Sequence, residues 1–135
     1  MDLLEKAIDI AFEVFGESEP FEHSMIVCSL ARRSAQTRKY IVGIVGILHD
    51  VVEDSDWTLE DLQREGFSEE IVEAIDAISR REGEIYTEFI KRISKNKLAT
   101  TVKLADLIHN LSRTGKPSLI PRYRKAFEFL NSLEN

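Results

Sequence analysis

Apolar residues recur at helical spacing along most of this chain. Over the first fifteen residues the pattern is regular, and Gly16 follows it as a C-cap. The apolar positions there are Leu3, Leu4, Ala7, Ile8, Ala11, Phe12 and Phe15. Similar patterns predict further helices from about residue 21 and over about 38–52, 58–63, 68–78, 86–93, 98–111 and 121–133. Clear period-two alternation is absent, so the sequence predicts an all-α fold.

Two glycines lie within the apolar helix predicted over residues 38–52. Gly43 and Gly46 are three residues apart, which lowers helix propensity and indicates close approach by a neighbouring helix. Residues 17–20, 80–84 and 113–118 separate the helical patterns. We expect these segments to be mobile loops that give a substrate access to the protein.

Size and charge narrow the class of protein. The 135 residues are expected to form one domain, spanning 1–135. A net charge of −6 argues against a nucleic-acid polymer as partner, although a local basic pocket for an anionic small molecule is compatible with it. No apolar run approaches the roughly 20 residues that span a bilayer, and the acidic N-terminus is unlike a signal peptide. The single cysteine, Cys28, is expected to lie in the core. From these features together we expect a cytoplasmic protein without a membrane partner. The oligomeric state is left open.

The most informative segment is 48–54, which follows the apolar run 40–47 directly. It contains one imidazole and three carboxylates, those of His49, Asp50, Glu53 and Asp54. A buried carboxylate is costly unless it is paired or bound to a metal. A metal-centred active site is therefore the strongest explanation of four ionisable groups at the end of a core helix.

Two further elements carry candidate ligands. Asp106 and Asn110 are four residues apart, so they share a face of the helix predicted over 98–111. His23 lies in a helix with apolar neighbours. Taken singly, His49–Asp50 fits a helix-end ion pair, His23 a core histidine, and Asp106 with Asn110 a surface pair. Together they favour a site of two imidazoles and two carboxylates, which suits manganese, iron, zinc or magnesium better than copper.

Other polar residues have candidate roles around this site. Glu53 or Asp54 could accept a proton from water, provided that it lies outside the ligand set. Lys103 lies one turn before Asp106 and is the best placed of the candidate phosphate-binding residues. The other candidates are Arg80, Arg81, Arg113 and Lys116. Tyr86 and Trp57 could stack on a base, and His109 is expected near the ligands or on the surface, not as a ligand.

The same motifs resemble a known family. The chain resembles the HD-domain phosphohydrolases, and among them the hydrolase domains of RelA/SpoT-type alarmone enzymes and their small stand-alone relatives. The matching parts are His23 and residues 48–62, 81–84 before Tyr86, 102–111 and 122–126. The resemblance implies a single-domain HD-type helical bundle with a central metal, and removal of the 3′-pyrophosphate from guanosine tetra- or pentaphosphate.

The resemblance also assigns roles to individual residues. It implies that His23, His49, Asp50 and Asp106 bind the ion, with manganese as the metal. Glu53 and Asp54 match the acidic pair near the catalytic water. Asn110 matches a residue that contacts the nucleotide sugar or the surroundings of the metal.

One segment departs from the family pattern. Relatives carry a Gly-Gln-x-Arg-Lys type loop before the first ligand, and this loop helps to hold the nucleotide. Here residues 15–24 lack the basic pair, and two glutamates stand in the loop. Acids there repel a polyphosphate, by about 1 kcal/mol at 4 Å in bulk water for each pair of unit charges.

Two alternatives therefore accompany the leading prediction. One is hydrolysis of another nucleotide or phosphate ester, and the other is a catalytically silent HD fold that binds a nucleotide or partner.

Overall fold

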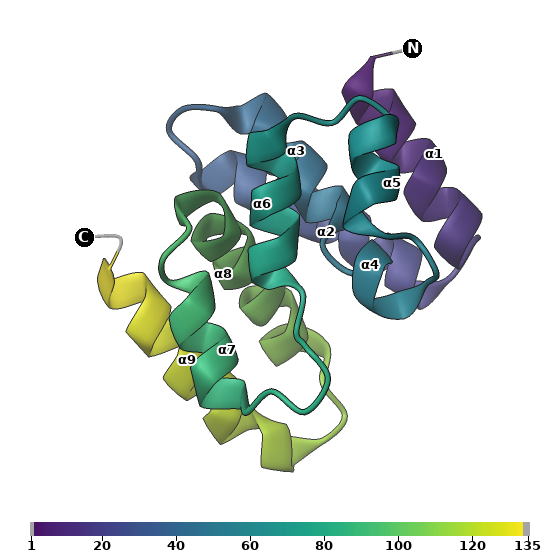
Figure 1. Ribbon diagram of the computed structural model, residues 1–135. Coiled ribbons are helices and arrows are strands. Elements are labelled where there is room, and N and C mark those ends of the chain that lie inside the picture. Colours follow the sequence, from purple (N-terminus) through teal and green to yellow (C-terminus); the bar gives the residue numbers. More distant parts are fainter. Residues whose placement is uncertain (1, 134–135) are drawn as a thin grey trace.

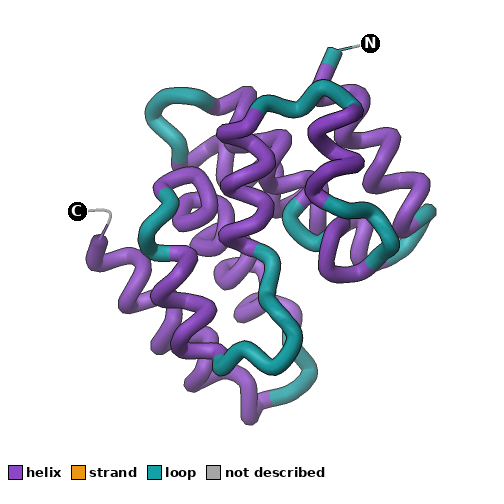
Figure 2. Tube along the Cα trace, in the orientation of Figure 1, coloured by secondary structure: helices purple, strands orange, loops and turns teal. Residues whose placement is uncertain are grey.

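The computed structural model describes residues 2–133, and its regular structure is helical throughout this range (Figure 1 and Figure 2). The elements are α1 Leu3–Phe15, α2 Glu19–Ser34, α3 Lys39–Leu48, α4 Val51–Asp54, α5 Leu59–Arg64, α6 Glu69–Ile78, α7 Tyr86–Ile93, α8 Lys97–Arg113, a 3₁₀ turn η1 Pro117–Leu119 and α9 Ile120–Leu133. The predicted all-α fold is confirmed, with no strand in the described range. None of the helices there is both long and apolar enough to cross a membrane.

Capping side chains explain where several helices begin. Each accepts a hydrogen bond from the backbone N–H three residues on. These caps are Asp2, Ser18, Thr58, Ser68 and Asn96. The Ser18 cap starts α2 at Glu19, earlier than the predicted start near residue 21. At α5 the Asp61 side chain returns a bond to the Thr58 backbone, which completes a capping box.

The prediction of one continuous helix over 38–52 is wrong. Helix α3 ends at Leu48, and a turn at His49 and Asp50 separates it from α4. The Nδ1 atom of His49 lies 2.7 Å from the carbonyl oxygen of Gly46, so this side chain bonds to the last turn of α3. Asp50, with φ −103° and ψ −4°, redirects the chain before Val51. The turn therefore separates segment 48–54 into two parts: Leu48 at the end of α3, and Val51–Asp54 in α4, with His49 and Asp50 between them.

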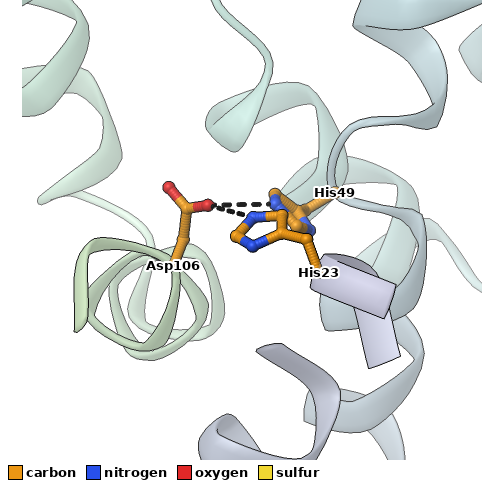
Figure 3. Close-up of side chains that lie close together, drawn as sticks. All are labelled: His23, His49 and Asp106. Atoms are coloured by element: carbon orange, nitrogen blue, oxygen red, sulfur yellow. Dashed lines mark hydrogen bonds and ion pairs between the residues drawn. The ribbon is translucent and has the colours of Figure 1, made fainter. Parts of the chain in front are cut away.

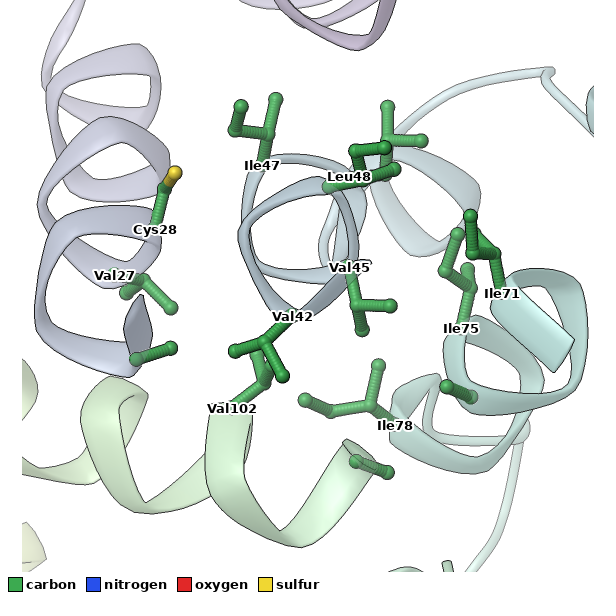
Figure 4. Packing of buried hydrophobic residues seen from close by; sticks show 14 of the residues in the cluster. Val27, Cys28, Val42, Val45, Ile47, Leu48, Ile71, Ile75, Ile78 and Val102 are labelled. Atoms are coloured by element: carbon green, nitrogen blue, oxygen red, sulfur yellow. The ribbon is translucent and has the colours of Figure 1, made fainter. Parts of the chain in front are cut away.

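Helix α3 is the centre of the hydrophobic core. All residues from Val42 to Leu48 are buried, and α3 contacts α1, α2, α6 and α8. Figure 4 shows its side chains spreading toward these neighbours, with Val27 of α2, Ile75 of α6 and Val102 of α8 around it. A helix that is apolar on all sides is stable only when it is enclosed in this way. Each buried Val, Leu or Ile side chain contributes about 1.5–3 kcal/mol.

The predicted close approach at the two glycines is confirmed, with different neighbours at each. A Cβ added at Gly46 would lie 3.0 Å from Cys28 Cα and 3.2 Å from Cys28 N, both in the α2 backbone. A Cβ at Gly43 would meet mainly the Arg32 side chain, with its Cδ at 2.8 Å. Cys28 itself is buried, as expected. The α2–α3 spacing therefore depends on Gly46 more than on Gly43.

We expect Gly46→Ala to lower the free energy of unfolding by about 1–3 kcal/mol, because the backbone of α2 cannot yield without moving core side chains. Gly43→Ala is the matched control. There the Arg32 side chain can rotate away, and alanine gains up to about 1 kcal/mol of helix propensity. Urea unfolding followed by circular dichroism measures both. Equal losses in the two variants would contradict the assignment of the close contact to Gly46.

Candidate metal centre

Three helices bring His23, His49 and Asp106 together (Figure 3). His23 comes from α2, His49 from the end of α3 and Asp106 from α8. Asp106 Oδ1 lies 2.7 Å from His23 Nε2 and 3.3 Å from His49 Nε2. All three residues are buried, and one ligand atom from each lies within 4.8 Å of the others. This cluster has the composition and spacing to hold a metal ion.

Asp50 lies beside this cluster without being part of it. Its Oδ2 is 3.1 Å from His49 Nε2 and 4.0 Å from His23 Nε2, and its side chain is 30% exposed. The structure thus brings together three of the four predicted ligands and places the fourth at the solvent side of one imidazole. The role of Asp50 as a ligand stays a prediction.

The imidazole of His49 shows why this cluster attracts a cation. The Gly46 carbonyl can only accept a hydrogen bond, so the Nδ1 atom of His49 must carry a proton. In a neutral ring, Nε2 then presents a lone pair toward the carboxylate oxygens of Asp106 and Asp50. Lone pairs facing one another repel. A second proton on His49, or a metal ion between these atoms, removes the repulsion.

The charges in the cluster support the same conclusion. Burial lowers the pKa of His49, but the Asp50 charge and the hydrogen bonds to Asp106 and Asp50 outweigh it and hold the pKa well above its ordinary value. Burial opposes ionisation of Asp106, yet Lys103 and the two histidines hold its pKa well below the usual range. The carboxylate therefore stays charged although it is buried.

Each member of the cluster also has a partner on its outer side. Lys103 Nζ lies 2.9 Å from Asp106 Oδ2, and the Gly46 carbonyl holds His49. His109 Nδ1 lies 2.7 Å from His23 Nδ1. Such outer contacts fix the orientation of metal-binding side chains. Burial, together with the neighbouring His23 ring and the positive charge of Arg113, lowers the pKa of His109.

Two predicted phosphate-binding residues already have protein partners. Lys103 is 12% exposed, and besides its bond to Asp106 its Nζ lies 5.3 Å from the centre of the Phe89 ring. Arg81 Nη2 lies 3.1 Å from Asp76 Oδ1 in an exposed pair. A phosphate would have to share these cations. Their roles as substrate contacts stay predictions.

Asn110 lies outside the cluster as well. Its Oδ1 accepts hydrogen bonds from Nε and Nη2 of Arg113 at 3.2 and 3.0 Å. Arg113 Nη1 also lies 2.8 Å from Glu19 Oε1, which is one of the glutamates near the altered loop. This chain of contacts connects the end of α8 to the start of α2. It also partly neutralises an acid that would otherwise repel an anionic substrate.

The predicted proton acceptors, Glu53 and Asp54, lie on the short helix α4 and are exposed. Partial desolvation raises the pKa of both carboxyl groups, and repulsion from Asp50 adds to the effect. Glu53 Oε1 accepts a hydrogen bond of 2.6 Å from the backbone N–H of Arg80. A carboxylate with a raised pKa is a better proton acceptor from water than an ordinary one.

Tyr86 begins α7, and two arginines lie against its ring. The guanidinium carbon of Arg122 is 3.8 Å from the ring centre and that of Arg80 is 5.5 Å away. The Tyr86 hydroxyl is buried and has no hydrogen-bond partner in the described part of the chain. With Arg122 against the ring, less of it is free to stack on a base than the sequence suggested. Sequence reasoning gave Arg122 no role, because its contact with Tyr86 joins helices that are far apart in the chain.

Arg92 anchors the loop that connects α6 to α7. Its Nε and Nη2 bind the two carboxylate oxygens of Glu84 at 3.0 and 2.8 Å. It also donates to the carbonyl oxygens of Asp76, Ala77 and Ser79 at the end of α6. The same loop carries the Arg80 N–H that bonds to Glu53. The loop is therefore more constrained than the expected mobility of residues 80–84 implied.

Cavity size alone does not identify this site. A cavity of about 860 Å³ lies among the α2–α3 loop, the start of α6 and the turn before α8, and none of the predicted site residues line it. The identification rests instead on buried ionisable groups from three helices.

Comparison with known proteins gives partial relatives. One is a "Probable GTP pyrophosphokinase" of Mycobacterium leprae, 30% identical over 77 residues that cover 50% of this chain and 10% of the relative. Another is a "GTP pyrophosphokinase" of Streptomyces coelicolor, 29% identical over 77 residues that cover 50% of this chain and 9% of the relative. The chain thus spans about a tenth of the length of these curated relatives. Their names belong to RelA/SpoT-type enzymes, which supports the sequence resemblance in part. No model of a known protein family matches the chain.

We expect Glu84→Gln to destabilise the protein at neutral pH and to match the wild type in acid. Its hydrogen bonds to Arg92 lower the pKa of Glu84 from 4.5 to about 2. Because the folded pKa lies below the unfolded value, the stabilisation is complete above about pH 5 and is lost as the pH falls toward 2. The expected difference near neutral pH is on the order of 1–3 kcal/mol.

Urea unfolding over this pH range measures the difference. Glu88→Gln is the control, because the Glu88–Lys91 pair is exposed and contributes less than about 1 kcal/mol. A difference between wild type and Glu84→Gln that stays constant with pH would contradict the ion-pair assignment.

Proposed function

We propose that residues 1–135 form a single HD-type phosphohydrolase domain that acts on a nucleotide with the help of a divalent metal ion. The observation that carries this proposal is the buried cluster of His23, His49 and Asp106. The carboxylates of α4 and the cations around Tyr86 meet at Arg80, whose backbone N–H bonds to Glu53 and whose guanidinium lies against the Tyr86 ring. Hydrolysis at phosphorus needs both kinds of group.

The proposed ligands are His23, His49, Asp106 and, from its edge position, Asp50. Two imidazoles and two carboxylates form a donor set that suits manganese, our proposed metal, and also suits iron, zinc and magnesium. When bound, such an ion lowers the pKa of a coordinated water and neutralises negative charge on phosphorus. Lys103 keeps Asp106 ionised, so the ligand set is charged before any ion arrives.

Glu53 and Asp54 are the proposed proton acceptors. Both lie outside the ligand cluster, and both have pKa values raised by partial desolvation. The Arg80 N–H fixes the position of one Glu53 oxygen, which leaves the other free to accept a proton. Glu53 is the better-positioned of the two for this reason.

The phosphates of the substrate are proposed to lie near α7 and α9. The unpartnered hydroxyl of Tyr86 supports this, because a buried donor without a partner costs about 1–3 kcal/mol and a phosphate oxygen would satisfy it. Arg122 is the nearest cation to that ring. Lys103 and Arg81 would add positive charge, and Asn110 would contact the sugar.

A (p)ppGpp-like guanosine 3′-pyrophosphate is the proposed substrate. The matched relatives named GTP pyrophosphokinase support a guanosine nucleotide with a pyrophosphate group. A pyrophosphokinase activity is not proposed for this chain, because the buried His and Asp cluster suits hydrolysis. The missing basic pair near residues 15–24 favours the alternative of another nucleotide or phosphate ester. The cytoplasmic location stays part of the proposal.

The purified protein should bind about one divalent ion per chain, as expected for a single ligand cluster. Asp106→Ala should abolish binding, because it removes the carboxylate that both imidazoles face, and Asp50→Ala should weaken it. Asp9→Ala, at an exposed position on α1, is the control and should bind as the wild type does. Metal analysis after dialysis and titration with Mn²⁺ measure binding. Equal metal content in wild type and Asp106→Ala would show that the ligand assignment is wrong.

A panel of phosphorylated nucleotides assayed with added manganese tests the substrate. We expect pyrophosphate release from guanosine tetraphosphate, and a rate lower by roughly 10²–10⁴-fold in Glu53→Gln with metal binding unchanged. Cleavage of other compounds with guanosine tetraphosphate untouched would support the alternative substrate. Failure to cleave any compound while an ion is bound would support a silent binding fold.

A further inference from the structure

All three histidines of this chain lie together, and one of them has no role in the proposed reaction. His109 lies on α8, three residues after Asp106, so both project from neighbouring positions on that helix. The Asp106 carboxylate contacts Nε2 of His23, while His109 contacts Nδ1 of the same ring. One turn of α8 therefore contacts both nitrogen atoms of His23.

The geometry limits what the contact between the two rings can be. The two Nδ1 atoms are 2.7 Å apart, and the rings are nearly parallel, with 17° between their planes and 4.9 Å between their centres. Two nitrogen atoms at this distance share one proton, with one ring donating and the other accepting. If His109 donates, His23 must carry its own proton on Nε2. If His23 donates, its Nε2 keeps a lone pair.

These two arrangements differ in whether His23 can bind a metal. A ligand nitrogen needs its lone pair, so only the form with the proton on Nδ1 can use Nε2 as a ligand. The other two members of the cluster already have fixed outer partners, the Gly46 carbonyl for His49 and Lys103 for Asp106. Within residues 2–133, no carbonyl or carboxylate bonds to Nδ1 of His23, and His109 occupies that place.

We propose that His109 is a positioning residue that accepts the Nδ1 proton of His23 and so leaves Nε2 of His23 free as a metal ligand. This inference rests on the metal site of the proposed function. His109 is itself outside the group of ligand atoms, and its Nδ1 is directed at His23. Its effect on a bound ion is therefore exerted through the ring that it orients.

Titration of the metal-free protein with Mn²⁺ tests the inference. We expect His109→Ala to weaken Mn²⁺ binding about 10–100-fold, as is typical for loss of an outer partner of a ligand. His109→Asn should recover most of the affinity, because its Oδ1 can accept a hydrogen bond near the position of Nδ1. Ile108→Ala is the control, since this neighbouring side chain is 46% exposed and should not alter binding.

Two further measurements separate positioning from a merely structural role. Urea unfolding of the metal-free variants should give midpoints close to that of the wild type. In Zn²⁺-loaded protein, ¹⁵N–¹H correlation spectra of the imidazoles should show the proton on Nδ1 of His23 and none on Nδ1 of His109. A proton on Nδ1 of His109 in the loaded protein, or Mn²⁺ affinity unchanged in His109→Ala, would overturn the inference.

The outcomes also distinguish this inference from the proposed function. If the wild type binds Mn²⁺ and His109→Ala binds it equally well, only the role of His109 is wrong. If the wild type binds no ion, both the metal site and the role of His109 are wrong. If binding behaves as expected and no nucleotide is cleaved, the role of His109 stands and the hydrolase proposal fails.

Discussion

The carboxylate of Asp106 has to stay charged inside the helical bundle, and much of the surrounding structure follows from that requirement. An isolated buried carboxylate is strongly destabilising, and even a paired one is stable only when its oxygens are fully bonded. Lys103 satisfies one oxygen of Asp106, and the imidazoles of His23 and His49 face the other. Lys103 is itself largely buried and depends on the same carboxylate. Loss of either charge would leave the other uncompensated, so α2, α8 and the end of α3 are held in one arrangement.

The apolar core and the polar cluster are connected through Gly46. The absence of a side chain there lets the backbone of α2 approach α3 closely at Cys28, five residues after His23. The carbonyl of the same glycine orients the ring of His49. The packing distance between α2 and α3 therefore also affects the distance between the imidazoles of His23 and His49. A change in that packing would alter the cluster without touching any ionisable group.

Helix periodicity was sufficient to predict the all-α fold, because most apolar faces are long and regular. The break after Leu48 was missed, since it depends on a local bond from His49 to Gly46 that no hydrophobic pattern encodes. The cluster of His23, His49 and Asp106 was predictable because each residue stands among apolar neighbours. The contacts of His109 with His23 and of Arg122 with Tyr86 depend on how distant helices pack, and spacing along the chain does not reveal them. The roles of Asp50, Glu53 and Asp54 stay predictions.

The arrangement of charge around the cluster bears on which molecule would be hydrolysed. The acids of α4 and the cations near α7 and α9 come from different parts of the bundle (Figure 1), and the loop held by Arg92 contacts both groups through Arg80. In the altered loop, Glu19 is engaged by Arg113, so it adds less negative charge to the entrance than the sequence alone implies.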